Sequence, residues 1–402
     1  MKNEFCVYAK KCNSCQLCNL SYEEQLRMKE SKCRRLLGGL CKTERITPSP
    51  KTEGYRNKAQ FVYRQEGKRV LCGIYKSTAR SVVAVDGCAI CSENANAIAQ
   101  ELSKLFQSFK IRPYDFHTGR GWLKSVVIRE NRDGDCMAVI NGADGVFPGK
   151  RSFVTALQKA CPQVKTAVIA VNRDPRKLFT GAQSEALFGE GFITDTLCGE
   201  KFRISPTSFY QINRDQTERL YQKAIELAEL SGNERVLDAY CGIGTIGIAA
   251  SRKAKEVLAV ELNPAAIRDA RINARLNDIG NIRFTAADSK EYARALAENG
   301  ERIDVVFIDP PRAGCTASFL KSLARLSPER IVYISCNPET QARDLRVLGR
   351  LGYKAEVCYP FDMFPHTNHV ESVVLLRWKN IDNHLEFTWT DEEFGTKKGT
   401  LS

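Results

Sequence analysis

The chain of 402 residues is long enough for two or three domains, and its 43% hydrophobic and 27% charged content is ordinary for a globular protein. No apolar run reaches the length that crosses a bilayer, and the N-terminus lacks the apolar core of a signal peptide, so we expect a cytoplasmic protein. A net charge of +13 favours a polyanionic partner such as RNA or DNA, and a charge that only keeps the protein in solution is the alternative.

Cysteines dominate the first twenty residues, and the chain has 16 in all. A disulfide scaffold does not suit a protein of this size in a reducing compartment, so metal ligation or catalysis explains some of them better. Four thiolates can hold an iron–sulfur cluster or zinc, and two ligand sets stay open: Cys6, Cys12, Cys15 and Cys88, or the pairs Cys15/Cys18 and Cys88/Cys91. Unrelated free thiols are the third interpretation, which the clustering disfavours.

Residues 1–45 make the first predicted segment, in which a helix over residues 21–37 follows the cysteines. Ser21 is the expected N-cap, with Glu24 three residues further on in a capping box. The helix has basic residues around its circumference, which contact RNA or simply face water: Arg27, Lys29, Lys32, Arg34 and Arg35. A loop with two prolines follows.

Residues 46–200 are predicted to form an α+β domain of antiparallel strands, with helices over residues 92–109 and 152–160. Basic and aromatic residues alternate along its first strands: Tyr55, Arg56, Lys58, Phe61, Tyr63, Arg64, Arg69, Tyr75, Lys76 and Arg80. This mixture suits stacking and phosphate contact with single-stranded RNA, so the domain is a candidate RNA-binding domain. An ordinary sheet with one solvated face explains the pattern equally well.

Residues 201–380 alternate strands and helices, after a first helix that Asn213 caps and that runs to about Leu230. Regular alternation of this kind predicts a Rossmann-like, doubly wound parallel sheet with helices on both faces. The tail over residues 381–402 has no clear period and is left unassigned.

The stretch from Val236 to Thr245, VLDAYCGIGT, reads as a strand, a glycine-rich turn and the start of a helix. Such a turn exposes backbone N–H groups at a sheet's carboxyl edge, and Glu261, which ends the next strand, is placed to accept hydrogen bonds from a ribose. The glycines match the dinucleotide pattern G-x-G-x-x-G, which would indicate NAD or FAD. Asp238 before the turn instead favours a cationic ligand such as S-adenosylmethionine.

Two reactive side chains are predicted at the same edge, and a third residue is a candidate base. Asp309 follows one strand and begins the stiff sequence DPPR, and Cys336 follows the next strand and begins CNP. Glu371 begins the last strand and is a candidate base, although an exposed carboxylate at a strand end is the simpler interpretation. A thiol, a carboxylate and a cofactor that meet in one crevice form a reaction centre.

Several of these stretches together resemble the RNA uracil-5-methyltransferase family: SPTSFYQIN, DAYCGIGTIG, DPPRAG, SCNPETQARDL and DMFPHTNHVES. The segment CVYAKKCNSCQLCNLSYEEQL is similar to the cluster segment of that family's bacterial 23S rRNA enzymes. The resemblance runs from Cys6 to about Arg377. It implies a class I methyltransferase fold, S-adenosylmethionine in place of NAD, and a 4Fe–4S cluster on Cys6, Cys12, Cys15 and Cys88.

Carried over by position, the resemblance implies Cys336 as the nucleophile and Glu371 as the base. It also implies a set of residues that line the donor site or its junction with the uracil: Gln211, Tyr240, Thr245, Glu261, Asp288 and Asp309. Two departures stand out. Cys18 replaces a usual glutamine, and the N-terminal β-barrel of some relatives is expected to be absent because Cys6 is almost the first residue.

The sequence therefore predicts transfer of a methyl group from S-adenosylmethionine to C5 of a uridine in 23S rRNA, through a covalent bond between cysteine and C6. Methylation of a tRNA uridine is the alternative within the family, and a nicotinamide-dependent oxidoreductase is the alternative outside it. The sequence does not indicate which uridine is modified.

Overall fold

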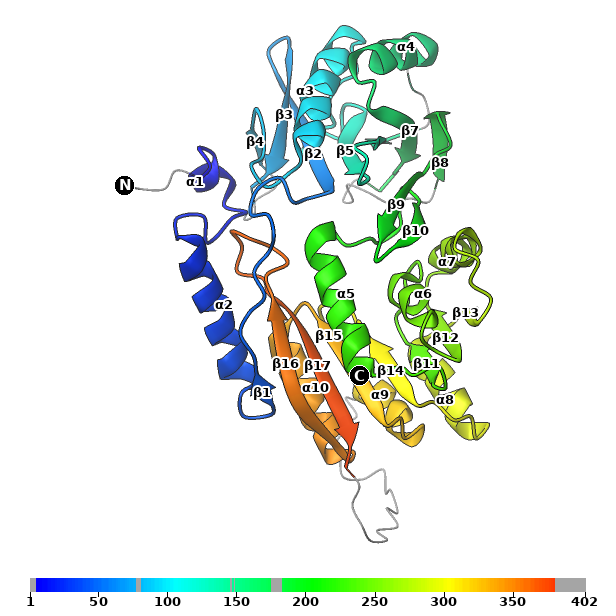
Figure 1. The fold of residues 1–402 in the computed structure, drawn as a ribbon. Coiled ribbons are helices and arrows are strands. Elements are labelled where there is room, and N and C mark those ends of the chain that lie inside the picture. The colour runs from blue at the N-terminus through cyan, green and yellow to red at the C-terminus, as the bar shows by residue number, and fades with distance from the viewer. Residues whose placement is uncertain (1–4, 77–80, 145–146, 148, 175–182, 380–402) are drawn as a thin grey trace, which may run out of the picture.

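The computed structural model describes residues 5–76, 81–144, 147, 149–174 and 183–379, so Arg80 and the predicted tail lie outside the described residues. Figure 1 shows two bodies, a central body built on a seven-stranded sheet and a C-terminal body built on an eight-stranded sheet. Across the described ranges, each helix is too short or too polar to cross a membrane.

The eight-stranded sheet confirms the doubly wound prediction. Its order is β13–β12–β11–β14–β15–β17–β16–β1. The first five strands in this order are parallel to one another, and β17 is antiparallel to both of its neighbours. The strands are β11 (Arg235–Asp238), β12 (Glu256–Glu261), β13 (Ile282–Ala286), β14 (Val305–Ile308), β15 (Arg330–Ser335), β16 (Tyr353–Phe361), β17 (Glu371–Trp378) and β1 (Lys42–Thr43). The carboxyl ends of the five parallel strands therefore share one edge.

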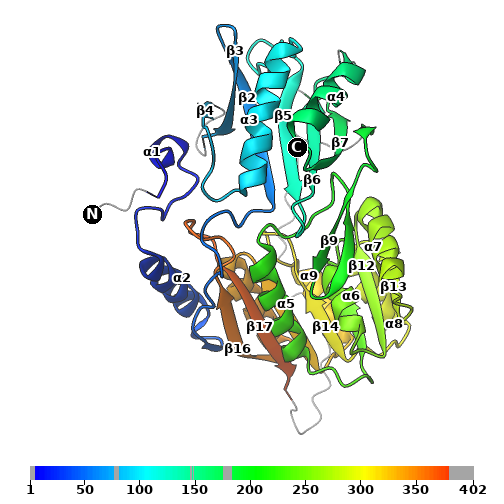
Figure 2. The same cartoon turned by 45° about the horizontal axis from the view of Figure 1, so that its top comes forward.

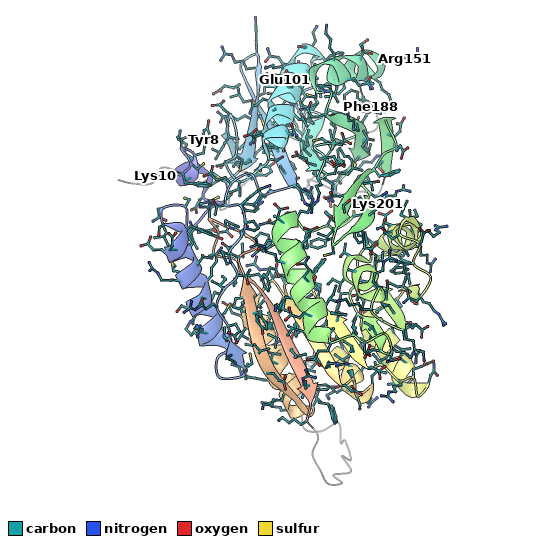
Figure 3. All side chains as sticks on the ribbon, viewed as in Figure 1. Tyr8, Lys10, Glu101, Arg151, Phe188 and Lys201 are labelled. Atoms are coloured by element: carbon teal, nitrogen blue, oxygen red, sulfur yellow. The ribbon has the colours of Figure 1, made fainter. Side chains whose placement is uncertain are left out.

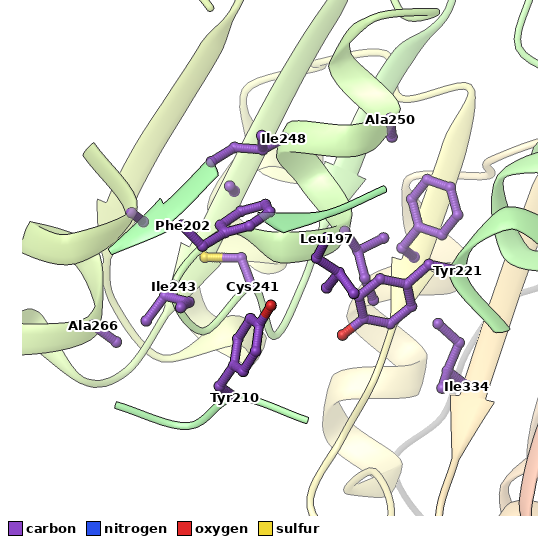
Figure 4. Close-up of a cluster of buried hydrophobic side chains, with 14 of the residues drawn as sticks. Leu197, Phe202, Tyr210, Tyr221, Cys241, Ile243, Ile248, Ala250, Ala266 and Ile334 are labelled. Atoms are coloured by element: carbon purple, nitrogen blue, oxygen red, sulfur yellow. The ribbon is translucent and has the colours of Figure 1, made fainter. Parts of the chain in front are cut away.

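Alternate residues of each central strand enter different cores, as a sheet covered on both faces requires. In β11, Val236 packs under α5, α6 and α7, whereas Leu237 packs under α8, α9 and α10. Figure 4 shows part of the first core, where Tyr221 of α5 and Ile248 of α6 lie. The six helices are α5 (Arg214–Ala228), α6 (Thr245–Ser251), α7 (Pro264–Leu276), α8 (Ser289–Glu298), α9 (Ala317–Arg325) and α10 (Pro338–Arg350).

The N-terminal segment contains α1 (Ala9–Cys12) and α2 (Tyr22–Leu37), and α2 packs on α10 and β16 of the C-terminal body (Figure 2). The predicted capping box is confirmed, because Ser21 N–H donates to Glu24 Oε2 at 2.8 Å and Glu24 N–H donates to Ser21 Oγ at 3.3 Å. One stripe of α2 is buried at four-residue spacing, and it comprises Gln25, Lys29, Cys33 and Leu37. The expectation that Lys29 faces water or RNA is therefore wrong, whereas Arg27, Arg34 and Arg35 are exposed.

The central body has the sheet order β4–β3–β2–β5–β6–β7–β8. Its pairs are antiparallel as predicted, except that β6 and β7 run parallel because α4 carries the chain back between them. The elements are β2 (Lys58–Glu66), β3 (Arg69–Tyr75), β4 (Val82–Ala84), α3 (Glu93–Ser108), β5 (Leu123–Glu130), β6 (Cys136–Gly142), α4 (Lys150–Ala160), β7 (Val164–Val171) and β8 (Gln183–Phe188). A hairpin of β9 (Ile193–Leu197) and β10 (Glu200–Ile204) follows and packs on α6 and α7 (Figure 2).

Aromatic residues of the predicted stacking surface are mostly inside this body. Tyr55, Phe61 and Tyr63 are 5%, 1% and 4% exposed, so they are core residues that no base can reach. Arg64 and Arg69 are exposed next to the turn of the β2–β3 hairpin. The stacking interpretation is thus wrong for the three aromatics, and the simpler interpretation of a half-buried sheet accounts for them.

Candidate active site

The turn after β11 is held by Asp238 and by its glycines. Asp238 is buried, and its Oδ2 accepts a hydrogen bond from Gly247 N–H at 3.0 Å, so the carboxylate anchors the start of α6. Burial raises the pKa of Asp238 to about 7. A Cβ at Gly247 would lie 2.9 Å from the same oxygen, and Gly244 has a φ of 87°, so both positions need glycine. Asp238 therefore shapes the turn, rather than offering an exposed charge to a ligand.

Glu261 reaches the same turn from the end of β12. Its Oε2 accepts from Gly242 N–H at 3.3 Å and its Oε1 from Asn263 N–H at 2.8 Å. A Cβ at Gly242 would meet no atom within 4 Å, so the turn is open beside this half-buried carboxylate. An accessible carboxylate next to an open glycine turn fits the ribose and backbone-amide contacts of an adenosyl group.

The other residues predicted at the donor site differ in their contacts and in their exposure. Thr245 begins α6, where its Oγ1 lies 3.2 Å from the Tyr221 hydroxyl, and half-buried Tyr240 packs edge-on against Phe319. Asp288 follows β13 and is exposed, and its carboxylate is near enough to Tyr240 to contribute to the raised pKa of that phenol. Gln211 comes from the segment before α5 and is buried.

The carboxyl edge brings the three reactive side chains together. Asp309 follows β14, and Cys336 follows β15, the neighbouring parallel strand. Ser335 pairs with Ser372 in the antiparallel β15–β17 ladder, so the next residues along these two strands, Cys336 and Glu371, stand opposite each other. The insertion of β17 beside β15 therefore explains how a residue 35 positions later in the sequence meets the cysteine.

Electrostatics show that these groups act on one another. Burial raises the pKa of Glu371 to about 8, with Asp309 adding to the effect, and burial raises the pKa of Asp309 to about 7. The pKa of Cys336 is raised to about 11, first by burial and then by the Glu371 and Asp309 carboxylates, while Arg312 opposes them. Three groups that resist ionisation in one place are a mark of a reaction centre.

Residues that were not predicted from the sequence form hydrogen bonds next to Cys336 and Glu371 and support this edge of the sheet. The Ser372 hydroxyl donates to Gln341 Oε1 at 2.7 Å, and Gln341 Nε2 donates to the Tyr333 carbonyl at 3.1 Å, all within the buried interior. Asn337 caps α10 through Glu339 N–H, and its Nδ2 donates to the Arg312 carbonyl at 3.2 Å. The Asn-Pro pair that begins α10 was the available signal for this cap.

The cysteine-rich segment packs between the two bodies. The hydroxyl of Tyr8, the residue just before α1, donates to Asp86 Oδ2 at 2.7 Å and ties the segment to the central body (Tyr8 is labelled in Figure 3). One cavity is lined mainly by apolar side chains and by four of the cysteines: Cys6, Cys12, Cys15 and Cys88. Neither Cys18 nor Cys91 is among its lining residues, although the raised pKa of Cys15, about 12, reflects burial and the nearby Cys88 and Cys18.

Two geometric observations bear on what the four thiols could hold. In the part of the chain that the structure describes, no three His, Cys, Asp or Glu side chains converge closely enough for a single metal ion. The four cysteines nevertheless surround a shared cavity, which is the arrangement that a multi-iron cluster with four thiolate ligands requires. All four cysteines of the first predicted ligand set line this cavity, whereas only Cys15 and Cys88 of the zinc-like set do.

Comparison with known proteins places this chain in a family. The model of the family described as tRNA (Uracil-5-)-methyltransferase matches residues 186–379. An uncharacterized RNA methyltransferase of Halalkalibacterium halodurans is 39% identical over 382 residues, covering 93% of this chain and 83% of its own length. One of Clostridium tetani is 38% identical over 378 residues, covering 93% and 82%.

A solved structure shows the same fold. The crystal structure of Pyrococcus abyssi tRNA (uracil-54, C5)-methyltransferase in complex with S-adenosyl-L-homocysteine has a TM-score of 0.77 and 30% identity, over 90% of this chain and 85% of that one. The class I fold and the methyl donor are thereby established over the nicotinamide alternative. The chain belongs to the S-adenosylmethionine-dependent RNA uracil-5-methyltransferase family.

Proposed function

We propose that the protein methylates C5 of a uridine in 23S rRNA, with Cys336 as nucleophile and Glu371 as base. The observation that carries the proposal is the meeting of Cys336, Glu371 and Asp309 at the sheet edge that also holds the donor turn. The choice of rRNA is supported by the likeness of the N-terminal cysteine segment to that of bacterial 23S rRNA enzymes. The net charge of +13 suits any large RNA.

The side chains divide the chemistry between them. Cys336 reacts as its thiolate: its sulfur bonds to C6 of the uracil, the C5–C6 π bond opens to an enolate, and C5 becomes nucleophilic. Bound S-adenosylmethionine supplies the methyl group that C5 takes. The Glu371 carboxylate then removes the C5 proton, and the C6–S bond breaks to release the thiolate and restore the ring. Asp309 is placed to hydrogen-bond the edge of the uracil, which must leave its stack to enter the crevice.

We also propose which residues bind the methyl donor. Glu261 and the open turn at Gly242 would hold the adenosyl ribose and its neighbouring groups, with Thr245 and Tyr240 around them. Gln211 and Asp288 complete the predicted set. Together with the catalytic edge, these residues belong to the proposed methyltransferase domain of residues 201–380.

The proton-abstraction step should depend on pH. Glu371 works only as a carboxylate, and burial raises its pKa to about 8, so the decay rate of the covalent RNA adduct is expected to rise as pH increases through about 8. Because the pKa of Cys336 is about 11, the rate of adduct formation should keep rising beyond that point. Rapid-quench measurements of both phases between roughly pH 6 and 9.5 would check this. An adduct decay rate that stays flat over this range contradicts the assignment of Glu371.

Methylation of a tRNA uridine is the second candidate, since the solved relative with a TM-score of 0.77 is named as a tRNA (uracil-54, C5)-methyltransferase. The two are separated by incubating the enzyme with labelled donor and either 23S rRNA or tRNA that lacks 5-methyluridine. We expect 5-methyluridine in the rRNA alone. Label in tRNA alone would replace the first candidate by the second, and label in neither would reject both.

We also propose that Cys6, Cys12, Cys15 and Cys88 hold a 4Fe–4S cluster, because these four thiols line one apolar cavity. No step of the proposed reaction needs an electron, so the cluster would act as a structural link between residues 1–45 and the domain of residues 46–200. Such a link would hold both parts as the surface that grips RNA, through exposed residues such as Arg27 and Arg64.

Substituting one proposed ligand should remove the cluster. Cys88→Ser is expected to lose the visible iron–sulfur absorbance and most of the bound iron and sulfide of the anaerobically purified protein. Cys161→Ser, which changes a buried cysteine at the end of α4, is the control and should keep both. Equal iron content in the two variants would show that Cys88 is not a ligand.

A further inference from the structure

The loop between β16 and β17 leads directly into Glu371, which pairs with Phe361 at the base of this hairpin. Four consecutive carbonyls of the loop accept hydrogen bonds from four separate segments: Met363 from Asn213 Nδ2 at 3.1 Å, Phe364 from Lys29 Nζ at 3.0 Å, Pro365 from the Tyr55 hydroxyl at 3.1 Å, and His366 from Leu17 N–H at 2.9 Å. Buried carbonyls need such partners, so these donors fix the path of the loop.

His366 has a left-handed backbone conformation within this loop, and α2 contacts it. Its φ of 68° lies in the left-handed region, which residues with side chains rarely adopt. Gln25, fully buried on α2, accepts from His366 N–H at 2.8 Å and brings its Nε2 within 3.2 Å of His366 Nδ1. Phe5 stacks on the imidazole with 3.5 Å between ring centroids. The unusual backbone of His366 is thus imposed by the N-terminal segment.

Lys29 adds a charge to the same contact, one helical turn after Gln25. Its Nζ lies 2.5 Å from Asp362 Oδ1, and both side chains are buried. Separating a buried ammonium from its carboxylate is costly, because each charge would then be left unpaired. Gln25 and Lys29 therefore lock α2 to the two ends of the turn from Asp362 to His366 in one register.

We propose that Gln25, Lys29 and Tyr55 are positioning residues for Glu371, an inference that rests on the proposed role of Glu371 as the base. They act through the loop that precedes β17, and they keep the carboxylate opposite Cys336. A base must lie within hydrogen-bond reach of the proton that it removes, so a small shift of the loop slows proton abstraction. Formation of the Cys336–C6 bond does not use this carboxylate and should be spared.

The chain offers a matched pair of variants for the test. Tyr55→Phe removes the hydroxyl that donates to the loop at 3.1 Å, and Tyr63→Phe removes one that donates to the Ala99 carbonyl of α3, also at 3.1 Å. Both tyrosines are buried, and both variants keep the ring. We expect Tyr55→Phe and Gln25→Ala to slow decay of the RNA adduct about tenfold while its formation stays within about twofold of wild type. Tyr63→Phe should change neither rate.

Single-turnover reactions with labelled donor and the RNA that the enzyme methylates, quenched and resolved on denaturing gels, give both rates. Equal decay in Tyr55→Phe and Tyr63→Phe would overturn the proposal, and thermal melting confirms that each variant is folded. If Gln25→Ala does not fold, the tyrosine pair decides alone. Glu371→Gln is the reference variant. If the RNA adduct decays slowly in Glu371→Gln but normally in Tyr55→Phe, only the positioning role is rejected. If the adduct decays normally in Glu371→Gln, both the role of Glu371 as base and the positioning role are rejected.

Discussion

Cys336→Ala is expected to abolish both methyl transfer and the covalent RNA adduct, with a loss of turnover of about 10⁴-fold or more. The reason is that C5 of uracil is too weak a nucleophile to take a methyl group until sulfur has added to C6. Alanine leaves the fold intact, because Cys336 is only half-buried and stands just past the end of β15. Binding of S-adenosylmethionine should be unchanged, since the donor turn lies on β11 and α6.

The measurement is incorporation of label from the methyl donor, together with a denaturing gel for the adduct and calorimetry for donor binding. Cys198→Ala is the control, because Cys198 is also a half-buried cysteine but lies between β9 and β10. Residual turnover of Cys336→Ala within about tenfold of wild type would remove the thiol from the reaction and leave a direct transfer to be explained.

Glu371→Gln is expected to trap the adduct, with turnover reduced by about 10³-fold and the protein–RNA band accumulating. Glutamine has nearly the same shape but cannot take the C5 proton, so addition and methyl transfer proceed while elimination stops. Glu200→Gln, at a buried carboxylate that binds Arg252, is the control and should turn over normally. Absence of the trapped band would assign proton removal to another group.

The same substitution should raise stability in a pH-dependent way. The pKa of Glu371 in the folded protein is about 8, above its ordinary 4.5, so the folded state binds the proton more tightly than the unfolded chain. The contribution of Glu371 to wild-type stability should then fall as pH rises from about 4.5 through 8, because the buried carboxylate ionises. Thermal melts at pH 8.5 should show Glu371→Gln a few degrees above wild type, with the difference vanishing near pH 4.5. A carboxylate at this buried position, where we propose the base, therefore lowers stability at alkaline pH.

The sequence predicted correctly those features that depend on interactions between residues close together in the chain. The capping box at Ser21, the Asn213 cap of α5 and the alternation of strands and helices after Val236 were all confirmed, because each depends on neighbouring residues. Asp309 and Cys336 were predicted to share an edge because both follow parallel strands, whereas Glu371 was only a candidate base at the start of the last strand. Their placement at that edge follows from the parallel sheet, whereas their chemical roles stay predictions.

Other features depended on contacts that no local pattern encodes. Tyr55 and Tyr63 read as an RNA-stacking surface because alternation does not tell which face of a sheet is covered. Lys29 read as one more surface charge, since its partner Asp362 lies 333 residues away. One signal was available: Gln25 and Lys29 continue the four-residue spacing of Cys33 and Leu37, which marks them as polar residues on the buried stripe.

The contact between α2 and the loop before β17 also constrains the order in which parts of the protein can fold. Residues 25 and 366 are separated by 341 positions, so the helix is synthesised long before the segment that neutralises its buried ammonium exists. Docking of α2 must wait until nearly the whole chain has left the ribosome, and contacts of such long range form late in folding. A nascent chain therefore cannot yet hold Glu371, the proposed base, in the position that the finished fold gives it.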